Sequence, residues 1–278
     1  MQTDKIPAAD VAKLRKMTGA GMMNSKKALE QAHGDFEQAT DILRKNGQKI
    51  AAKRADRDGV EGVVVAQTNG GEALGIMLSL NCETDFVAKN EDFMRLSRDI
   101  LDIAVQRNTS SAAVLLDEQI GHITIREKLT EQTGVIGERI GIDHFSRLEA
   151  PYVGYYIHSN DKIGALVGLS KRVSAAREVA RNIAMQVVAM NPIALDEKGV
   201  SEAVVARELE IGKERAIRAG KPAELAARIA QGRLRKFLRE NTLVAQVYIK
   251  DEGLTVEKYL QSIDGDLKIV AFEKIALG

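Results

Sequence analysis

The chain has 278 residues, 45% of them hydrophobic and 28% charged, which suits about two compact domains with ordinary cores and a hydrated surface. Its 40 basic and 39 acidic side chains leave a formal net charge of +1, which gives no support to nucleic-acid binding as the main activity. The single cysteine, Cys82, excludes an intramolecular disulfide and a thiolate metal cluster.

Residues 8–46 have the apolar spacing of three short helices separated by glycines. Asp35 stands at an N-cap position with Gln38 three residues on, the pattern of a capping box. Gly47 lies where a helix-ending glycine is expected. Three helices in so short a segment form a small core, and the segment is either a packing module or a binding module.

The charged stretch at residues 48–59, "QKIAAKRADRDG", has no apolar periodicity and predicts a connector or a solvated extension of the preceding helix. Its lysines and arginines could contact phosphates. Asp56 and Asp58 are interleaved with them, which favours a solvated connector.

Two strand–turn–strand–helix segments follow the same plan. "GVVVAQT" and "EALGIMLSL" alternate as strands around Asn69–Gly71, and Asn90 is placed to cap the next helix. "YVGYYIH" and "IGALVGLS" form a second hairpin, followed by a helix that Pro192 ends. The shared plan indicates an internal duplication, with antiparallel sheets backed by helices.

The segment between the hairpins is predicted to be helical to about Thr133, after which "GVIGERIG" turns into the strand "IDHFSRLEA". At the end of the chain, "QVYIK", the helix "TVEKYLQSI" and the strand "DLKIVAFEKI" are expected to complete the second sheet.

Residues 201–240 predict two antiparallel helices joined at Gly220-Lys221-Pro222. Charges dominate both helices and leave one narrow apolar seam, formed by Val204, Val205, Leu209, Ile217, Leu225, Ile229, Leu234 and Phe237. Such a hairpin either projects by roughly 28 Å as an arm or folds back onto the body.

No catalytic pattern is visible in the sequence. The four histidines do not stand at metal-ligand spacing, and no phosphate-binding glycine loop or nucleophile motif occurs. We therefore expect a binding protein without enzymatic activity, cofactor or metal. No apolar run approaches the roughly 20 residues of a membrane helix, and the first residues resemble neither a secretory signal nor a transit peptide, so a cytoplasmic protein is expected.

The stretch "NCETDFVAK" places an acidic and a large aromatic side chain, Asp85 and Phe86, at the junction between a strand and a helix. Phe86 either belongs to the core of the protein or enters another molecule, and the local pattern alone does not choose between the two.

Several motifs together resemble the elongation factor Ts family, the nucleotide-exchange factors of the GTPase elongation factor Tu. They are "MTGAGMMNSKKALEQAHGDFEQATDILRKNG", "NCETDFVAKNEDF", "IGE" at residues 136–138, "YIHSNDKIGALV" and the arm around "GKP". The resemblance extends from about Val11 to the C-terminus.

The resemblance implies an α+β fold in four parts. Residues 1–55 would form a three-helix module resembling ubiquitin-associated domains, with its linker. Residues 56–141 would form the first half of a two-part core, and residues 142–198 with 243–278 the second half. Residues 199–242 would form an antiparallel coiled-coil arm, through which homodimer contacts are possible.

The resemblance also implies a site. Thr84, Asp85, Phe86 and Val87 would enter elongation factor Tu near its Mg²⁺ and loosen the bound GDP. Further contacts with elongation factor Tu are implied for Lys26, Ile136, Gly137, His158 and Ile249. No membrane and no direct nucleic-acid contact are expected.

The chain departs from common features of the family at three places. Asn24 replaces an aspartate, Asp143 and His144 replace paired arginines, and "QVYI" lacks a proline near Ile249. Two other functions stay open: an adaptor that binds proteins through its helical head, and an RNA-binding protein that uses the basic linker and "RLRKFLR". The latter run is interpreted here as a solvated helix face.

Overall fold

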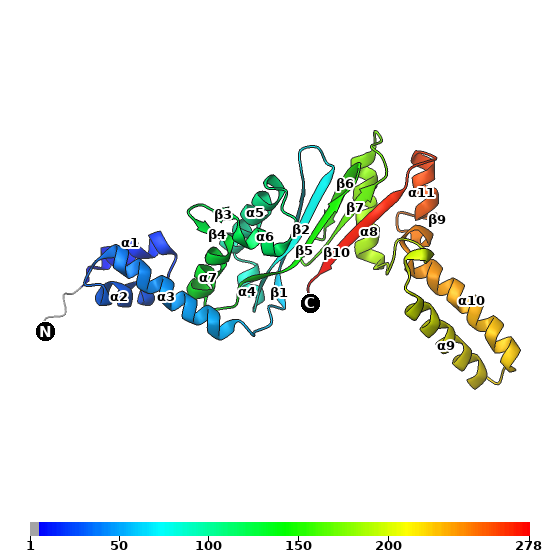
Figure 1. Cartoon of the computed structure of the whole chain (residues 1–278), viewed down its shortest axis with the longest axis horizontal. Helices are drawn as coiled ribbons and strands as arrows, with labels where there is room; N and C mark the ends of the chain where they lie inside the picture. Colours follow the sequence, from blue (N-terminus) through cyan, green and yellow to red (C-terminus); the bar gives the residue numbers. More distant parts are fainter. Residues whose placement is uncertain (1–5) are drawn as a thin grey trace. The chain divides into compact units, whose positions relative to one another are not determined.

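The computed structural model describes residues 6–278 and divides into two compact units (Figure 1). Unit 1 contains the chain up to Val65, Leu78–Phe145 and Ile275–Gly278, and unit 2 contains Ala66–Met77 and Ser146–Lys274. Helices and antiparallel strand pairs make up both, so the predicted α+β class is confirmed. Within residues 6–278, no helix combines the length and apolar character needed to cross a membrane.

Unit 1 begins with the three predicted helices, α1 (Ala8–Thr18), α2 (Met22–Gln31) and α3 (Phe36–Arg54). They enclose a small core that contains Leu14, Leu29 and Ala39. The side chain of Asp35 accepts a hydrogen bond of 2.8 Å from the backbone N–H of Gln38, which confirms the N-cap. We call these three helices the head.

The prediction that Gly47 ends the third helix is wrong, because α3 continues to Arg54. Gly47 instead lies against Gly134 in α7 (Ile125–Ile136), and a Cβ placed on Gly134 would lie only 2.4 Å from the Cα of Gly47. The two glycines therefore let α3 and α7 touch through their backbones. The charged residues after Gly47 extend the helix to Arg54. Of the two expected structures for this stretch, a connector or a solvated helix extension, the helix extension is thus found up to Arg54.

A three-stranded sheet has the order β1-β2-β5, formed by Glu61–Thr68, Leu74–Cys82 and Gly141–Glu149. Strand β2 is buried along its whole length. It is followed by the short α4 (Asp85–Ala88) and by α5 (Glu91–Gln106), which Asn90 caps as predicted. Between α5 and β5 lie α6 (Ala112–Asp117), the strand pair β3 (Gln119–Ile120) and β4 (Ile123–Thr124), and then α7. The predicted helix in this segment runs slightly beyond Thr133.

The second hairpin is confirmed in unit 2. Strands β6 (Tyr152–Ile157) and β7 (Ile163–Leu169) pair antiparallel, and α8 (Ala176–Met190) packs against them. The third strand of this sheet is β10 (Ile269–Ala276), so its order is β10-β7-β6. The strand–turn–strand–helix plan thus occurs twice, as the sequence indicated.

The expectation that "QVYIK" joins the second sheet is wrong. Its strand β8 (Val247–Tyr248) pairs instead with β9 (Asp251–Thr255), which leads into α11 (Val256–Ile263). Tyr248 is held in this position because its ring stacks on Tyr259 of α11, with 4.1 Å between the ring centroids.

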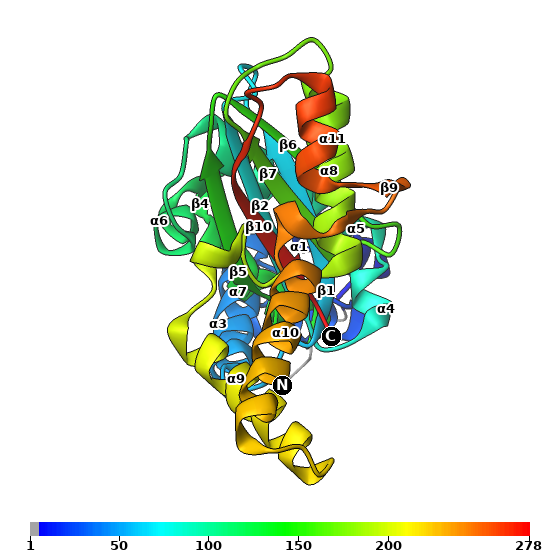
Figure 2. The ribbon, with the colours of Figure 1, turned by 90° about the vertical axis from the view of Figure 1, so that its right-hand side faces the viewer.

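The arm consists of α9 (Glu202–Arg218) and α10 (Ala223–Asn241), between the 3-10 turns η1 (Glu197–Gly199) and η2 (Leu243–Ala245). The two helices lie side by side and extend away from the sheet of unit 2 (Figures 1 and 2). The sequence left open whether the arm projects or folds back onto the body, and the structure shows that it projects from unit 2 (Figures 1 and 2).

The prediction of which residues form the seam of the arm is only partly correct. The fully buried positions are mostly small ones, namely Gly212, Ala216, Ala226 and Ala230, together with Leu238. Ile217 and Leu225 are instead 50% and 45% exposed. A Cβ on Gly212 would lie 3.1 Å from the Cα of Ala230, so the helix backbones are too close for large side chains to fill the seam.

Candidate functional site

The Thr84–Val87 loop follows the end of the buried strand β2 and begins the four-residue helix α4. Thr84 is the N-cap residue in extended conformation, so the chain turns sharply into the helix. The side chain of Phe86 is 83% exposed, whereas the following Ala88 is buried. Of the two interpretations of Phe86, burial in the core of its own protein is therefore excluded.

The carboxylate of Glu138 holds the backbone in front of Phe86. Its Oε2 accepts hydrogen bonds from the backbone N–H groups of Glu83 and Thr84, at 3.1 and 3.0 Å, and its Oε1 accepts one from the Thr84 hydroxyl at 2.7 Å. Three donors on one ionised acceptor make a strong local anchor. The exposed ring of Phe86 therefore projects from a fixed base.

Glu83 connects the same loop to the last turn of α3. Its carboxylate accepts hydrogen bonds from the backbone N–H of Arg139 at 2.7 Å and from the guanidinium of Arg54 at 2.6 and 2.7 Å. The Arg139 N–H, and after it Arg54, hold the pKa of the Glu83 carboxyl below its ordinary value. Arg139 in turn binds both carboxylate oxygens of Asp143, at 2.9 and 2.6 Å.

Asp85 is paired within its own helical turn. The Lys89 ammonium donates a hydrogen bond of 2.6 Å to Oδ2 of Asp85, and this bond raises the pKa of Lys89. Both side chains are substantially exposed, so the pair is weak in energy and able to exchange partners. The Asp85 carboxylate is thus accessible at the surface of unit 1.

A groove of about 560 Å³ lies beside Phe86 within unit 1. Phe86, Val87 and Ile136 line it together, with further walls from α5 and α7. Three of the predicted site residues are therefore brought to one place although about 50 residues of sequence separate them. Gly137 adjoins the groove as the left-handed C-cap of α7 (φ 83°), and it directs the chain towards Glu138.

Lys26, the predicted site residue in the head, does not line this groove. It is exposed on α2 and forms a 3.7 Å ion pair with Glu30. The structure thus places Lys26 on the surface of the head, where a partner could reach it.

His158 and Ile249 belong to unit 2. His158 is exposed at the end of β6, and its Nδ1 is 3.2 Å from the hydroxyl of Tyr156. The side chain of Ile249 is 38% exposed, while its backbone N–H donates to the buried side chain of Gln186 at 2.8 Å. Both predicted contact residues are accessible at the surface of their unit.

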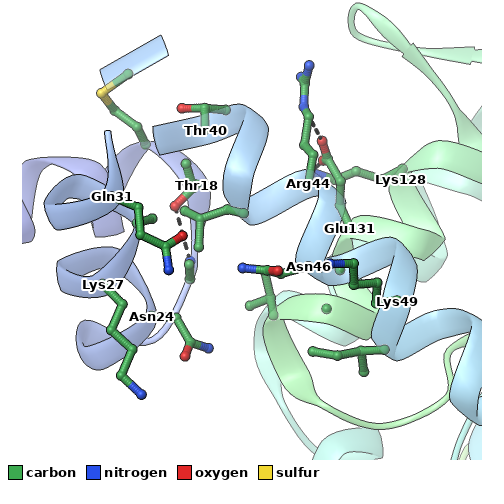
Figure 3. A pocket seen from close by; sticks show the side chains of 18 residues that line it. Thr18, Asn24, Lys27, Gln31, Thr40, Arg44, Asn46, Lys49, Lys128 and Glu131 are labelled. Carbon is green, nitrogen blue, oxygen red and sulfur yellow. Dashed lines mark hydrogen bonds and ion pairs between the residues drawn. The ribbon is translucent and has the colours of Figure 1, made fainter. Parts of the chain in front are cut away.

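A second cavity of unit 1, of about 480 Å³, lies between the head and α7 (Figure 3). Arg44 on one wall is joined to Glu131 on the opposite wall by a 3.2 Å ion pair, drawn as a dashed line in the figure. Asn24, one of the departures from the family, also lines this cavity. Nothing in the sequence pattern pointed to it, because its walls come from helices far apart in the chain.

Within residues 6–278, no cluster of three or more histidine, cysteine, aspartate or glutamate side chains could hold a metal ion. Cys82 is buried, and its burial raises the pKa of the thiol to about 12. A protonated, inaccessible thiol is a poor nucleophile, so Cys82 has the environment of a core residue and not that of a reactive cysteine.

Sequence reasoning missed the residues that hold the loop, namely Arg54, Glu83, Glu138 and Arg139. The motif "IGE" contained the only signal, since it includes Glu138, but a carboxylate 54 residues from its partner cannot be paired from one sequence. The structure adds these residues as the support of Phe86.

Comparison with known proteins agrees with these motifs. A family model described as elongation factor TS matches residues 83–278. Relatives named elongation factor Ts match nearly the whole chain. The protein from Christiangramia forsetii is 53% identical over 274 residues, 99% of each chain. That from Flavobacterium psychrophilum is 47% identical over 98% of this chain and 99% of its own. That from Porphyromonas gingivalis is 40% identical over 96% and 97%.

Proposed function

Since the chain belongs to the elongation factor Ts family, we propose that it binds the GTPase elongation factor Tu in its GDP-bound form and promotes the release of GDP. Release allows GTP to take the empty site. The protein makes and breaks no covalent bond in this process, and we place it in the cytoplasm with the translation machinery.

The observation that carries the proposal is an aromatic ring, 83% exposed, on a loop anchored by a carboxylate. Exposing a phenylalanine to water is unfavourable for the free protein, and the ordered base holds the ring in this exposed position. The exposed ring and the ordered base are both useful if Phe86 enters a pocket of a partner. A ring on a fixed base can displace groups of the partner without itself being displaced. Val87 and Ile136 extend the apolar surface around it.

GTPases hold their nucleotide through phosphate contacts and a shared Mg²⁺. Mg²⁺ requires nearly ideal octahedral geometry, so a ring inserted beside the metal shell weakens the coordination of GDP. Asp85 exchanges Lys89 for a donor of the GTPase and orients the ring. Thr84 supplies the turn that presents both side chains.

The exchange itself follows from thermodynamic linkage. If the factor lowers the affinity of the GTPase for GDP, GDP lowers the affinity for the factor by the same ratio. Binding of GTP then displaces the factor, which can act again. The factor changes the rate of exchange without changing the equilibrium between the two nucleotides.

The remaining contacts are proposed from the family resemblance. Lys26 and Ile249 would contact elongation factor Tu, and His158 would lie against its phosphate-binding loop. Gly137 would permit close approach beside Ile136. We also propose the four-part division at residues 55, 141, 198 and 242, and contacts between two copies through the arm.

The proposal is tested by the release of a fluorescent GDP from purified elongation factor Tu of the same organism. Added protein should accelerate release by orders of magnitude, and chelation of Mg²⁺ should reduce the stimulation because the metal contact is then already lost. Unchanged release, with complex formation intact, would instead favour an adaptor that binds through its head.

A further inference from the structure

The arm has a charge composition unlike the rest of the chain. Between Glu202 and Asn241 there are ten basic and six acidic side chains, although the whole chain has a net charge of only +1. Between Arg228 and Arg239 there are five basic side chains and no acidic one. The excess positive charge is therefore concentrated on one part of α10.

Three of these arginines form a stripe. Arg228, Arg235 and Arg239 are seven and four residues apart, which puts them within about 40° of one another around the helix axis. The residues of α10 buried against α9, Ala226 and Ala230, lie on the opposite side of the helix. All three arginines are exposed. We call them the arginine stripe.

Among the described residues, the arginine stripe makes no ion pair, although Glu224 stands one helical turn before Arg228. Within residues 6–278, none of its three guanidinium groups has an ion-pair or hydrogen-bond partner, whereas the neighbouring Lys236 pairs with Glu240. Arg235 and Arg239 are like charges at i and i+4, an arrangement that destabilises a helix. The repulsion between Arg235 and Arg239 is therefore unfavourable for the helix that carries them.

A second unfavourable choice lies on the same face. Gly232 is in the middle of α10, exposed, and a Cβ placed on it would meet nothing within 4 Å. Glycine inside a helix is less favourable than alanine, and here no neighbouring group requires it. Residues that oppose local stability without a packing reason are expected where a protein contacts a partner. Because Gly232 has no side chain, a partner can approach the backbone of α10 closely at this position, between Arg228 and Arg235.

We propose that this face of α10, the arginine stripe with Gly232, binds the phosphate backbone of RNA. A guanidinium group can donate two parallel hydrogen bonds to the oxygens of one phosphate. The ammonium group of lysine lacks this planar geometry, so arginine is the more suitable residue for bidentate phosphate binding. Residues four apart rise by about 6 Å along the helix, which is comparable with the separation of successive phosphates. We take RNA as the polyanion because the chain belongs to the elongation factor Ts family, for which we propose a role in translation.

The proposal departs from our interpretation of "RLRKFLR" as a solvated helix face and from the expectation of no direct nucleic-acid contact. It assigns no sequence specificity, because phosphate contacts position a protein without reading bases. It is also independent of nucleotide exchange, since the residues involved are not those of the Phe86 loop.

The test uses the full chain and a short fluorescent RNA hairpin of mixed sequence, with binding followed by anisotropy at several salt concentrations. Each phosphate contact contributes about 0.7 to 0.9 to the slope of log affinity against log salt. Changing Arg228, Arg235 and Arg239 together to glutamine should weaken binding at least tenfold at low salt and reduce that slope by about 2 to 3.

Two further variants make the result decisive. The matched control removes the same charge from α9, by changing Arg207, Lys213 and Arg215 to glutamine, and should leave the salt slope nearly unchanged. Gly232→Glu should raise the thermal stability of the arm, because it restores a helix-forming residue beside basic side chains, and yet weaken RNA binding. The opposing directions exclude misfolding as the cause.

Three results would overturn the proposal. They are no binding of the hairpin at low salt, equal losses in the α9 and α10 variants, and equal competition by polyglutamate at matched charge. The last would assign the stripe to an acidic protein partner.

Discussion

Glu138 lies 54 residues after Thr84, yet its carboxylate binds both the backbone N–H and the hydroxyl of that residue, at 3.0 and 2.7 Å. This contact joins the end of α7 to the base of the Phe86 loop. It explains how a loop with an exposed aromatic tip can keep one conformation. It also makes the position of the loop dependent on a residue that does not line the groove beside Phe86.

Changing Glu138 to alanine should impair stimulated GDP release even though the Phe86 ring stays intact. The change leaves the partly buried N–H groups of Glu83 and Thr84 without their acceptor, which costs about 1–3 kcal/mol of folding free energy. Urea unfolding measures this loss, and the fluorescent-GDP assay measures release. Glu138→Gln retains an acceptor oxygen and should recover most of the activity. Equal activity of Glu138→Ala and the wild type would contradict the positioning role.

Changing Phe86 to alanine should lower stimulated release by at least tenfold with little effect on stability. The side chain is 83% exposed, so its removal should change the free energy of unfolding by no more than about 0.5 kcal/mol. Complex formation should weaken much less than release slows. The matched control is Val114→Ala in α6, which trims another exposed apolar side chain of unit 1 and should be neutral. An equal loss of binding and release would make Phe86 a simple anchor.

Changing Gly134 to alanine should destabilise unit 1 by about 1–3 kcal/mol, because the new methyl group would lie 2.4 Å from the Cα of Gly47 and force α3 and α7 apart. Denaturant unfolding gives the change. Gly232→Ala is the matched control, since this helical glycine faces open space and its replacement should stabilise by about 0.5–1 kcal/mol. Tolerance of alanine at 134 would show that the helices can separate without loss.

The ion pair of Glu83 should make stability depend on acid pH. The folded protein lowers the pKa of this carboxyl below its ordinary 4.5, first through the Arg139 N–H and then through Arg54. The contribution of Glu83 to stability is therefore fully present above that ordinary value, and it is lost as the pH falls towards the lower pKa of the folded state. The difference in free energy of unfolding between the wild type and Glu83→Gln should be present at pH 7 and should shrink as the pH falls below 4.5 and through the lower pKa of the folded state. A constant difference at all pH values would exclude this origin.

Cys82 should not react with iodoacetamide in the folded protein at pH 8. Its thiol is buried, and burial raises its pKa to about 12, so both access and the reactive thiolate are lacking. Mass spectrometry after labelling measures the modified fraction, and the urea-unfolded chain serves as the control that reacts. Rapid labelling of the folded chain would indicate that β2 opens locally.

Local chemistry determined much of this protein. Alternation around Asn69–Gly71 predicted the first hairpin, and the side chains of Asp35 and Asn90 cap the helices that they were expected to cap. These features depend on residues a few positions apart, so one sequence contains all the required information. The motifs around Thr84–Val87 were specific enough to indicate the family.

The tertiary structure decided the features that depend on long-range packing. Gly47 has the sequence signature of a helix end, but its contact with Gly134 makes it a crossing point inside a longer helix. Small residues fill the seam of the arm because the backbones of its two helices approach closely. The pattern of apolar residues in the sequence does not indicate the distance between the two helices. Glu138 binds its loop across 54 residues, and Phe86 is exposed because no other segment of residues 6–278 packs over its ring. The sequence determines which residues can form a local turn or cap, whereas burial and distant pairing result from the whole chain packing together.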